Sequence, residues 1–221
     1  MISRETLSFL KELKINNNRD WFNENKKRFK AAETEVKSTA NTLFEMLKTH
    51  DAVDNVKLFR IYRDVRFSAN KEPYKTHFGI TFHRQKPEYR GGYYLHIEPG
   101  NSFIATGFWN PEKQDLNRIR KEFEMDDSEM REIMDNKTLQ SVWGQLKGDE
   151  VKSAPKGFNK EHPAIDLIKK KQYIFTKNFT DKEVLSKNFL EEADKSFRAI
   201  RPYFDYMSDV LTTDLNGVSL I

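Results

Sequence analysis

The sequence contains no cysteine and little proline or glycine, with 7 Pro and 9 Gly in 221 residues. The missing thiols exclude disulfide bonds, a cysteine nucleophile and zinc held by cysteine. Because Pro and Gly are sparse, no flexible linker or low-complexity tract interrupts the chain, and no internal repeat is present. We therefore predict one uncharacterised globular domain spanning residues 1–221.

Long apolar runs are also missing. No stretch approaches the roughly 20 apolar residues that a membrane-spanning helix needs. The first thirteen residues carry Arg4, Glu5, Lys11 and Glu12, which is unlike a secretory signal peptide. The sequence therefore predicts a soluble, cytoplasmic protein without a membrane partner.

A strong excess of charge of one sign is the third absence. Lys and Arg together number 38 and Asp and Glu number 34, so the formal net charge is +4. This mild excess permits an anionic partner without requiring one, and any anion site has to come from local clustering. Aromatic residues, in contrast, are plentiful: the 17 Phe predict an aromatic-rich core.

Hydrophobic periodicity predicts helices towards both ends of the chain and strands between them. Apolar residues at intervals of three and four predict a long helix over 19–50 and a last long helix after the T-x-x-E capping box at Thr180, which Pro202 should kink or end. Period-two alternation with short connections predicts antiparallel strands at about 56–67, 77–83, 91–98 and 102–109, with a brief further strand at 172–175. The prediction is an α+β domain, in which an antiparallel sheet of about four strands within 56–109 packs against a long N-terminal helix and C-terminal helices.

Positive charge is concentrated in residues 58–77, LFRIYRDVRFSANKEPYKTH, which we interpret as a strand and the turn after it. Arginine forks suit phosphate or carboxylate oxygens, and lysines add point charge. Asp64 would orient an arginine or act as a base. We therefore predict a small anionic or phosphorylated ligand as the partner. The candidate anion-binding residues are Arg60, Arg63, Asp64, Arg66, Lys71, Tyr74 and Lys75.

Other interpretations of the same stretch stay open. Arg63 falls on the apolar side of the predicted strand, where a structural ion pair would explain it as well as an anion contact. A nucleic-acid backbone would also satisfy these cations, although the mild charge and the lack of a recognisable reader motif argue against it. The third alternative is an interaction protein in which the arginine network is purely structural.

Three histidines are predicted on the polar face of the sheet. His77 and His83 would lie about 20 Å apart along one strand, so they do not share a metal. If His77 lies opposite Glu98, then His96 is its diagonal neighbour, and the three could bind zinc or iron. That register depends on a long connection, so we prefer surface or hydrogen-bonded histidines and predict no metal and no cofactor. Nucleotide-binding, hydrolase and metalloprotease motifs are absent, so no catalytic residue is assigned.

Several motifs together resemble a domain-of-unknown-function family of bacterial and fungal conserved hypothetical proteins. The motifs are RIYRDVRFSANKEPYKTHFGI at 60–80, NNNRDWF at 16–22, GGYYLHIEPGNSF at 91–103, GFWNP at 107–111 and PKGFNKEHPAIDLI at 155–168. They are spread along nearly the whole chain, and their combination is specific. The resemblance implies a single domain of about this length. It implies no catalytic residues, because no activity is established for the family.

Overall fold

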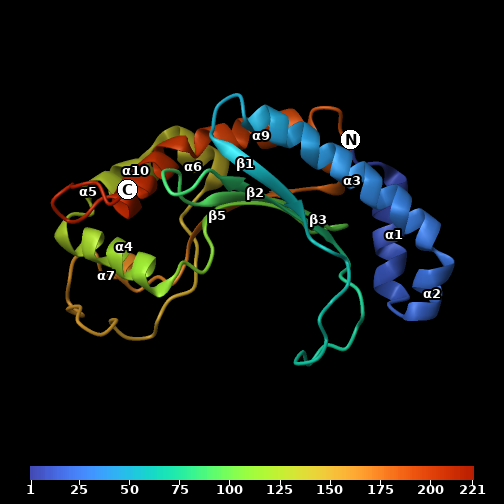
Figure 1. The fold of residues 1–221 in the computed structure, drawn as a ribbon, viewed down its shortest axis with the longest axis horizontal. Helices are drawn as coiled ribbons and strands as arrows, with labels where there is room; N and C mark the ends of the chain where they lie inside the picture. Colours follow the sequence, from blue (N-terminus) through green and yellow to red (C-terminus); the bar gives the residue numbers. More distant parts are fainter. The chain divides into compact units, whose positions relative to one another are not determined.

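The computed structural model describes residues 1–221 and has an α+β fold around one five-stranded antiparallel sheet (Figure 1). The strand order is β1-β2-β3-β4-β5, so each strand pairs with its neighbour in the sequence. The predicted fold class is confirmed, with five strands in place of about four. No helix has the length and apolar character needed to cross a membrane. The strands are β1 Val53–Leu58, β2 Phe78–Arg84, β3 Gly92–Ile97, β4 Ser102–Phe108 and β5 Tyr173–Phe179.

The chain divides into two compact units, and the sheet contributes residues to both. The first unit comprises Met1–Phe82, Tyr94–Ile104 and Asn178–Lys195. The second comprises His83–Tyr93, Ala105–Lys177 and Ser196–Ile221. The boundary runs through β2, β3, β4 and β5, because each of these strands has residues in both units.

The helices of the first unit come from both ends of the chain. The predicted long helix over 19–50 is in fact two helices, separated at Asn25. The Asn25 side chain donates from Nδ2 to the carbonyl oxygen of Trp21 at 2.9 Å, which satisfies the end of the first helix and interrupts its continuation. The helices are α1 Arg4–Ile15, α2 Arg19–Glu24, α3 Lys26–Leu47, α8 Asp181–Val184 and the first part of α9 Phe189–Ala199.

Aromatic rings form much of the core of this unit, as the composition predicted. Phe9, Phe22, Phe29 and Phe78 are each at most 3% exposed. Ring centroids lie 6.4 Å apart for Phe9 and Phe22, 5.1 Å for Phe22 and Phe29, and 6.4 Å for Phe29 and Phe78. This continuous contact joins the N-terminal helices to β2 and fixes the part of the sheet that carries the candidate site.

The second unit contains the remaining helices. Pro202 lies in the first turn of α10 and separates it from α9, which confirms the predicted break. The predicted capping box is present at Thr180 and Glu183, but it begins the short α8; the long α9 begins only at Phe189. The helices are α4 Lys113–Met125, α5 Ser128–Asp135, α6 Lys137–Trp143, α7 Ile165–Ile168, α10 Arg201–Thr212 and the last part of α9.

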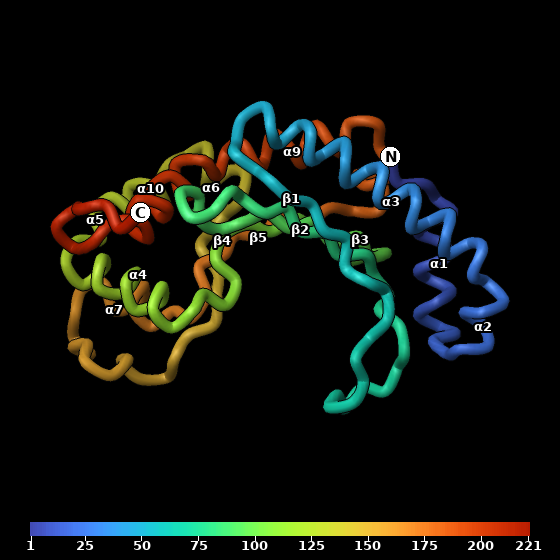
Figure 2. The backbone as a smooth tube through the Cα atoms, in the orientation of Figure 1, coloured from blue at the N-terminus to red at the C-terminus, as the bar shows by residue number.

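The arginine-rich stretch is the main correction to the predicted elements. The predicted strand over 56–67 is wrong beyond Leu58, where β1 ends, and residues 59–77 form a long loop that leads into β2 (Figure 2). The amide of Phe59 still donates to the Gly79 carbonyl at 2.9 Å, but beyond it the arms of the loop pair with each other instead of with the sheet. We call residues 59–77 the basic loop. A second difference is β5, which is longer than the brief strand predicted at 172–175.

Candidate functional site

The base of the basic loop is a short antiparallel pairing. Tyr62 and Tyr74 form an isolated bridge. The Arg63 amide donates to the Pro73 carbonyl at 2.9 Å, and the Lys75 amide donates to the Ile61 carbonyl at 2.7 Å. Because side chains alternate along paired extended segments, Arg63 and Lys75 point to the face opposite the two tyrosines.

The tyrosine face anchors the loop to the first unit. Tyr74 is 4% exposed, and its ring stacks on Phe22 at a centroid distance of 3.9 Å and an interplanar angle of 12°. The Asn17 side chain donates to the Tyr74 carbonyl at 3.0 Å and accepts from the Tyr74 amide at 3.2 Å. Tyr74, one of the predicted anion-binding residues, therefore anchors the basic loop to α2.

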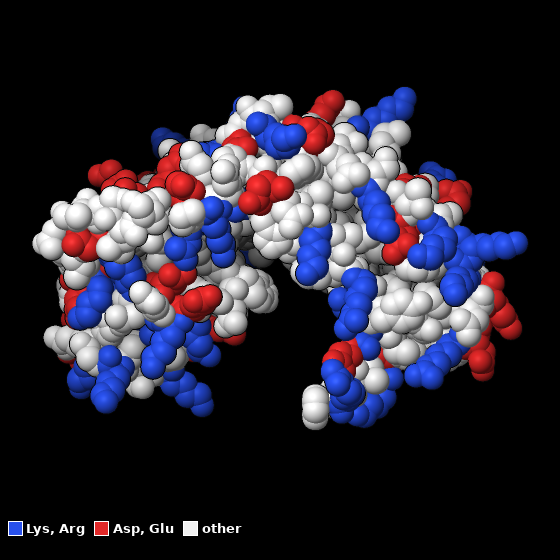
Figure 3. Space-filling view, viewed as in Figure 1, with Lys and Arg blue, Asp and Glu red and all other residues white.

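Both cations near the tip of the loop make hydrogen bonds within the loop, and one of them is paired with a carboxylate. Arg66 donates from Nε and Nη2 to the two carboxylate oxygens of Asp64 at 3.0 and 2.7 Å. Lys71 donates from Nζ to the Val65 carbonyl at 3.1 Å. Between them, the side chain of Phe67 is 97% exposed. Figure 3 shows Lys and Arg atoms gathered along the projecting basic loop, with a smaller share of Asp and Glu atoms among them.

Three cations of the basic loop have less compensation, and we call Arg60, Arg63 and Lys75 the basic cluster. Arg60 is exposed and makes no ion pair or side-chain hydrogen bond. Arg63 makes one ion pair, with Glu72 at 3.5 Å. Lys75 has its Nζ 5.4 Å from the centroid of the Phe59 ring. Burial lowers the pKa of Lys75, and the positive charges of Arg60 and Arg63 lower it further. The cluster therefore carries positive charge that the protein does not neutralise.

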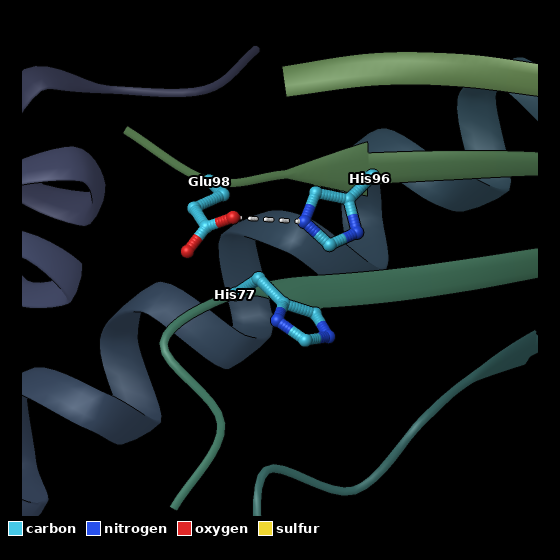
Figure 4. A group of neighbouring side chains, drawn as sticks. All are labelled: His77, His96 and Glu98. Carbon is cyan, nitrogen blue, oxygen red and sulfur yellow. Dashed lines mark hydrogen bonds and ion pairs between the residues drawn. The ribbon is translucent and has the colours of Figure 1, made fainter. Parts of the chain in front are cut away.

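Two histidines and a glutamate, His77, His96 and Glu98, lie close together at neighbouring strands (Figure 4). His77 directly precedes β2, His96 lies on β3 and Glu98 follows its last residue. One ligand atom from each lies within 4.8 Å of the other two. The centroids of the two imidazole rings are 4.2 Å apart. The structure thus brings together the three residues whose convergence depended on the register of β2 and β3.

Hydrogen bonds hold two of these side chains in place. The Tyr94 hydroxyl lies 3.0 Å from Nδ1 of His96, and Nε2 of His96 lies 3.3 Å from Oε2 of Glu98. Thr76 donates to Oε1 of Glu98 at 3.0 Å, and Asn101 donates to Oε2 at 2.8 Å. Sequence reasoning missed Thr76 and Asn101. The period-two spacing of Tyr94, His96 and Glu98 along one strand was the signal that could have indicated Tyr94.

The electrostatics keep both imidazoles neutral. Burial lowers the pKa of His77 to about 4, and the neighbouring His96 and the positive charges of Lys75 and Arg63 contribute. Burial also lowers the pKa of His96, against the opposing effect of Glu98. For Glu98, burial alone would raise the pKa, but hydrogen bonds from Asn101, Thr76 and His96 outweigh it and lower the pKa. Near neutral pH the group therefore offers two uncharged nitrogen donors and one carboxylate.

The basic cluster lies next to His77, His96 and Glu98, which we call the triad, within the first unit. Lys75 and His77 are two residues apart, and Thr76 between them contacts Glu98. The positive charges of Lys75 and Arg63 lie close enough to His77 to lower its pKa. The guanidinium and ammonium groups of the basic cluster suit the binding of an anion.

Comparisons with known proteins agree with the resemblance carried by the sequence motifs. A family model described as conserved hypothetical protein (DUF2461) matches residues 5–206. No curated protein and no solved structure matches the chain. Since the family model covers almost the entire chain, the protein belongs to the DUF2461 family of conserved hypothetical proteins.

Proposed function

We propose that this protein binds a small anionic ligand, phosphorylated or carboxylated, at the basic cluster in a cytoplasmic setting. The observation that carries the proposal is the imbalance of charge: Arg60, Arg63 and Lys75 make between them one ion pair, that of Arg63 with Glu72 at 3.5 Å, and the nearby Asp64 is already paired with Arg66. A guanidinium can bind two oxygens of a phosphate or carboxylate at once, and Lys75 adds a point charge.

The other predicted site residues take supporting roles in this proposal. The ion pair of Asp64 with Arg66 and the contact of Lys71 with the Val65 carbonyl give the tip of the loop its own hydrogen bonds. Tyr74 holds the base of the loop on Phe22. The ligand-facing role therefore goes to Arg60 and Lys75, which make no ion pair, and to Arg63, whose ion pair with Glu72 is long at 3.5 Å.

Titration of inorganic pyrophosphate into the full chain by isothermal calorimetry tests the proposal. We expect the Arg60→Ala variant to bind pyrophosphate about tenfold more weakly or worse, since a hydrogen bond to a charged group contributes about 1.5–3 kcal/mol. Arg66→Ala is the matched control: it removes an arginine from the same loop whose charge Asp64 already neutralises. Pyrophosphate that fails to bind, or that loses the same affinity in both variants, would refute the proposal.

A titration with an oligonucleotide and the melting temperatures of the variants test the two alternatives. A nucleic-acid partner predicts affinity for an oligonucleotide that exceeds the affinity for pyrophosphate and falls steeply with salt, because several phosphates release counterions. A purely structural arginine network predicts that Arg60→Ala and Arg63→Ala lower the melting temperature. We expect neither variant to shift it by more than about 2 °C, because the Arg60 side chain is exposed and unpaired and the Arg63–Glu72 ion pair is partly solvated.

A further inference from the structure

The convergence of His77, His96 and Glu98 has a chemistry of its own, separate from that of the basic cluster. Their ligand atoms lie within 4.8 Å of one another, and His96 is only 7% exposed. A hydrogen-bonded pair of His96 and Glu98 would explain two of the three side chains. It does not explain His77, which is half-buried against the His96 ring and makes no hydrogen bond or ion pair within the protein.

We propose that His77, His96 and Glu98 bind a divalent transition-metal ion. Two imidazole nitrogens and a carboxylate oxygen suit zinc, iron(II) or manganese, whereas magnesium and calcium prefer sets of oxygen ligands. Three protein ligands leave at least one coordination position open, which is the arrangement of sites that bind a further ligand and not of closed structural sites.

The side chains around the triad match the supporting contacts of known metal sites. Metal-binding imidazoles usually place their second nitrogen against an oxygen, and ligating carboxylates accept hydrogen bonds from neighbours. Tyr94 lies 3.0 Å from Nδ1 of His96, while Thr76 and Asn101 hold the two oxygens of Glu98. With a metal on Nε2, the Nδ1–H of His96 donates to the Tyr94 hydroxyl oxygen.

A glycine keeps this support in place. A Cβ added to Gly79 would lie 2.5 Å from the Tyr94 hydroxyl oxygen, so only glycine leaves Tyr94 free to lie over β2 and reach His96. The ring of His96 is also stacked on Phe103, with centroids 4.5 Å apart. Together these contacts hold the imidazole of His96 in one orientation, which reduces the ordering that a bound ion would otherwise require.

Binding requires a small closure of the triad. Ligands about 2.1 Å from one ion lie at most about 4.2 Å apart, so ligand atoms that lie near the 4.8 Å limit have to move slightly inward. His77 supplies most of this movement, because no hydrogen bond holds its ring. The His96–Glu98 hydrogen bond, at 3.3 Å, is replaced by coordination of both groups to the ion.

The positive basic cluster opposes a bare cation at this position. A divalent ion with Glu98 leaves a net charge of +1 beside Lys75 and Arg63, whose charges already reach His77. An anion in the open coordination position would neutralise both groups. This coupling between metal and anion rests on the proposed function, whereas metal binding by the triad does not.

The direct test is calorimetric titration of zinc chloride and, separately, manganese chloride into chelator-treated full-length protein, in a buffer without phosphate or carboxylate. We expect one ion per chain. His77→Ala removes a ligand without removing an internal hydrogen bond, and it should weaken binding by at least about 100-fold, since even supporting contacts of a metal are worth 10- to 100-fold. Glu98→Gln should weaken it comparably while keeping the size of the side chain.

His83→Ala is the control, because it removes an exposed imidazole near the other end of β2 and should leave metal affinity unchanged. Circular dichroism establishes that each variant is folded before titration. Wild-type protein that binds neither ion at one per chain would overturn the proposal. Equal affinity in wild type, His77→Ala and Glu98→Gln would overturn it as well. Because neither phosphate nor carboxylate is present, either result leaves the pyrophosphate experiment to decide the proposed function separately.

Discussion

Replacing Tyr74 with alanine is expected to lower the free energy of unfolding by about 3–5 kcal/mol, the range typical of deleting a buried aromatic side chain. The ring is 4% exposed and stacks on Phe22 at 3.9 Å, and it also lies 5.4 Å from the ring of Tyr62. Alanine would leave a cavity between the basic loop and α2, because the backbone contacts with Asn17 hold the loop too closely for it to collapse inward. Urea unfolding measures the change.

Phe67→Ala is the matched control for this prediction. It deletes an aromatic ring of the same loop, but that ring is 97% exposed, so the expected change is within about 0.5 kcal/mol. The Tyr74→Ala variant should also lose pyrophosphate affinity, since its loop no longer holds Arg63 and Lys75 in place. If both variants proved equally stable, the basic loop would not be anchored through Tyr74.

Replacing Arg84 with alanine should destabilise the second unit by about 3–5 kcal/mol as well. The side chain is fully buried; its Nη1 donates to the Arg90 carbonyl at 2.6 Å and to the Ser208 hydroxyl at 3.1 Å. Its guanidinium lies 4.5 Å from the ring centroid of Phe204. Alanine removes both the packing of the long stem and the side-chain donor to the Arg90 carbonyl, whereas the Ser208 hydroxyl still accepts from the Arg90 amide at 3.0 Å. Thermal or urea unfolding followed by tryptophan fluorescence measures the loss.

Arg84→Met separates the two contributions. Methionine keeps an unbranched stem against Phe204 but donates no hydrogen bond, so we expect it to lose about 1–3 kcal/mol, less than alanine does. A change below 1 kcal/mol in both variants would mean that the guanidinium is solvated in solution, contrary to its buried position. Equal, large losses in both would mean that the hydrogen bonds outweigh the packing.

Local patterns predicted most of the elements and the fold class. The α+β architecture, the antiparallel pairing of neighbouring strands and the helix break at Pro202 all follow from periodicity and from the chemistry of single residues. The interruption at Asn25 was not predicted, because the apolar stripe of α3 continues in phase across the end of α2. That break depends on one side chain that bonds a backbone carbonyl, and periodicity does not report it.

The basic loop shows where alternation misleads. Arg60, Tyr62, Asp64 and Arg66 alternate with apolar residues as in a strand, yet the chain leaves the sheet after Phe59. An extended arm of a loop has the same period of two as a strand, so the pattern does not distinguish them. What decides is the partner: the arm pairs with residues around Tyr74, and that pairing depends on contacts with helix residues far away in the sequence.

The sequence predicted the triad only under one assumed register of the strands that carry His77 and Glu98. His77 and Glu98 could be placed opposite each other only by assuming how β2 and β3 pair across their long connection. In the structure His77 lies against His96, and Thr76 bonds Glu98, 22 residues further along the chain. Contacts of this kind depend on how the whole sheet is paired. The residue types in the sequence identify candidate metal ligands, but they do not predict which of them lie close together.

Diffraction from crystals of the full chain, soaked with manganese chloride and inorganic phosphate, tests most directly whether the triad and the basic cluster form one ligand site. We predict an anomalous manganese peak in contact with His77, His96 and Glu98, and a phosphate on the ion whose oxygens contact Arg60, Arg63 or Lys75. Manganese bound elsewhere, or a triad without any peak while the cations of the basic cluster contact only protein groups and solvent, would contradict this arrangement.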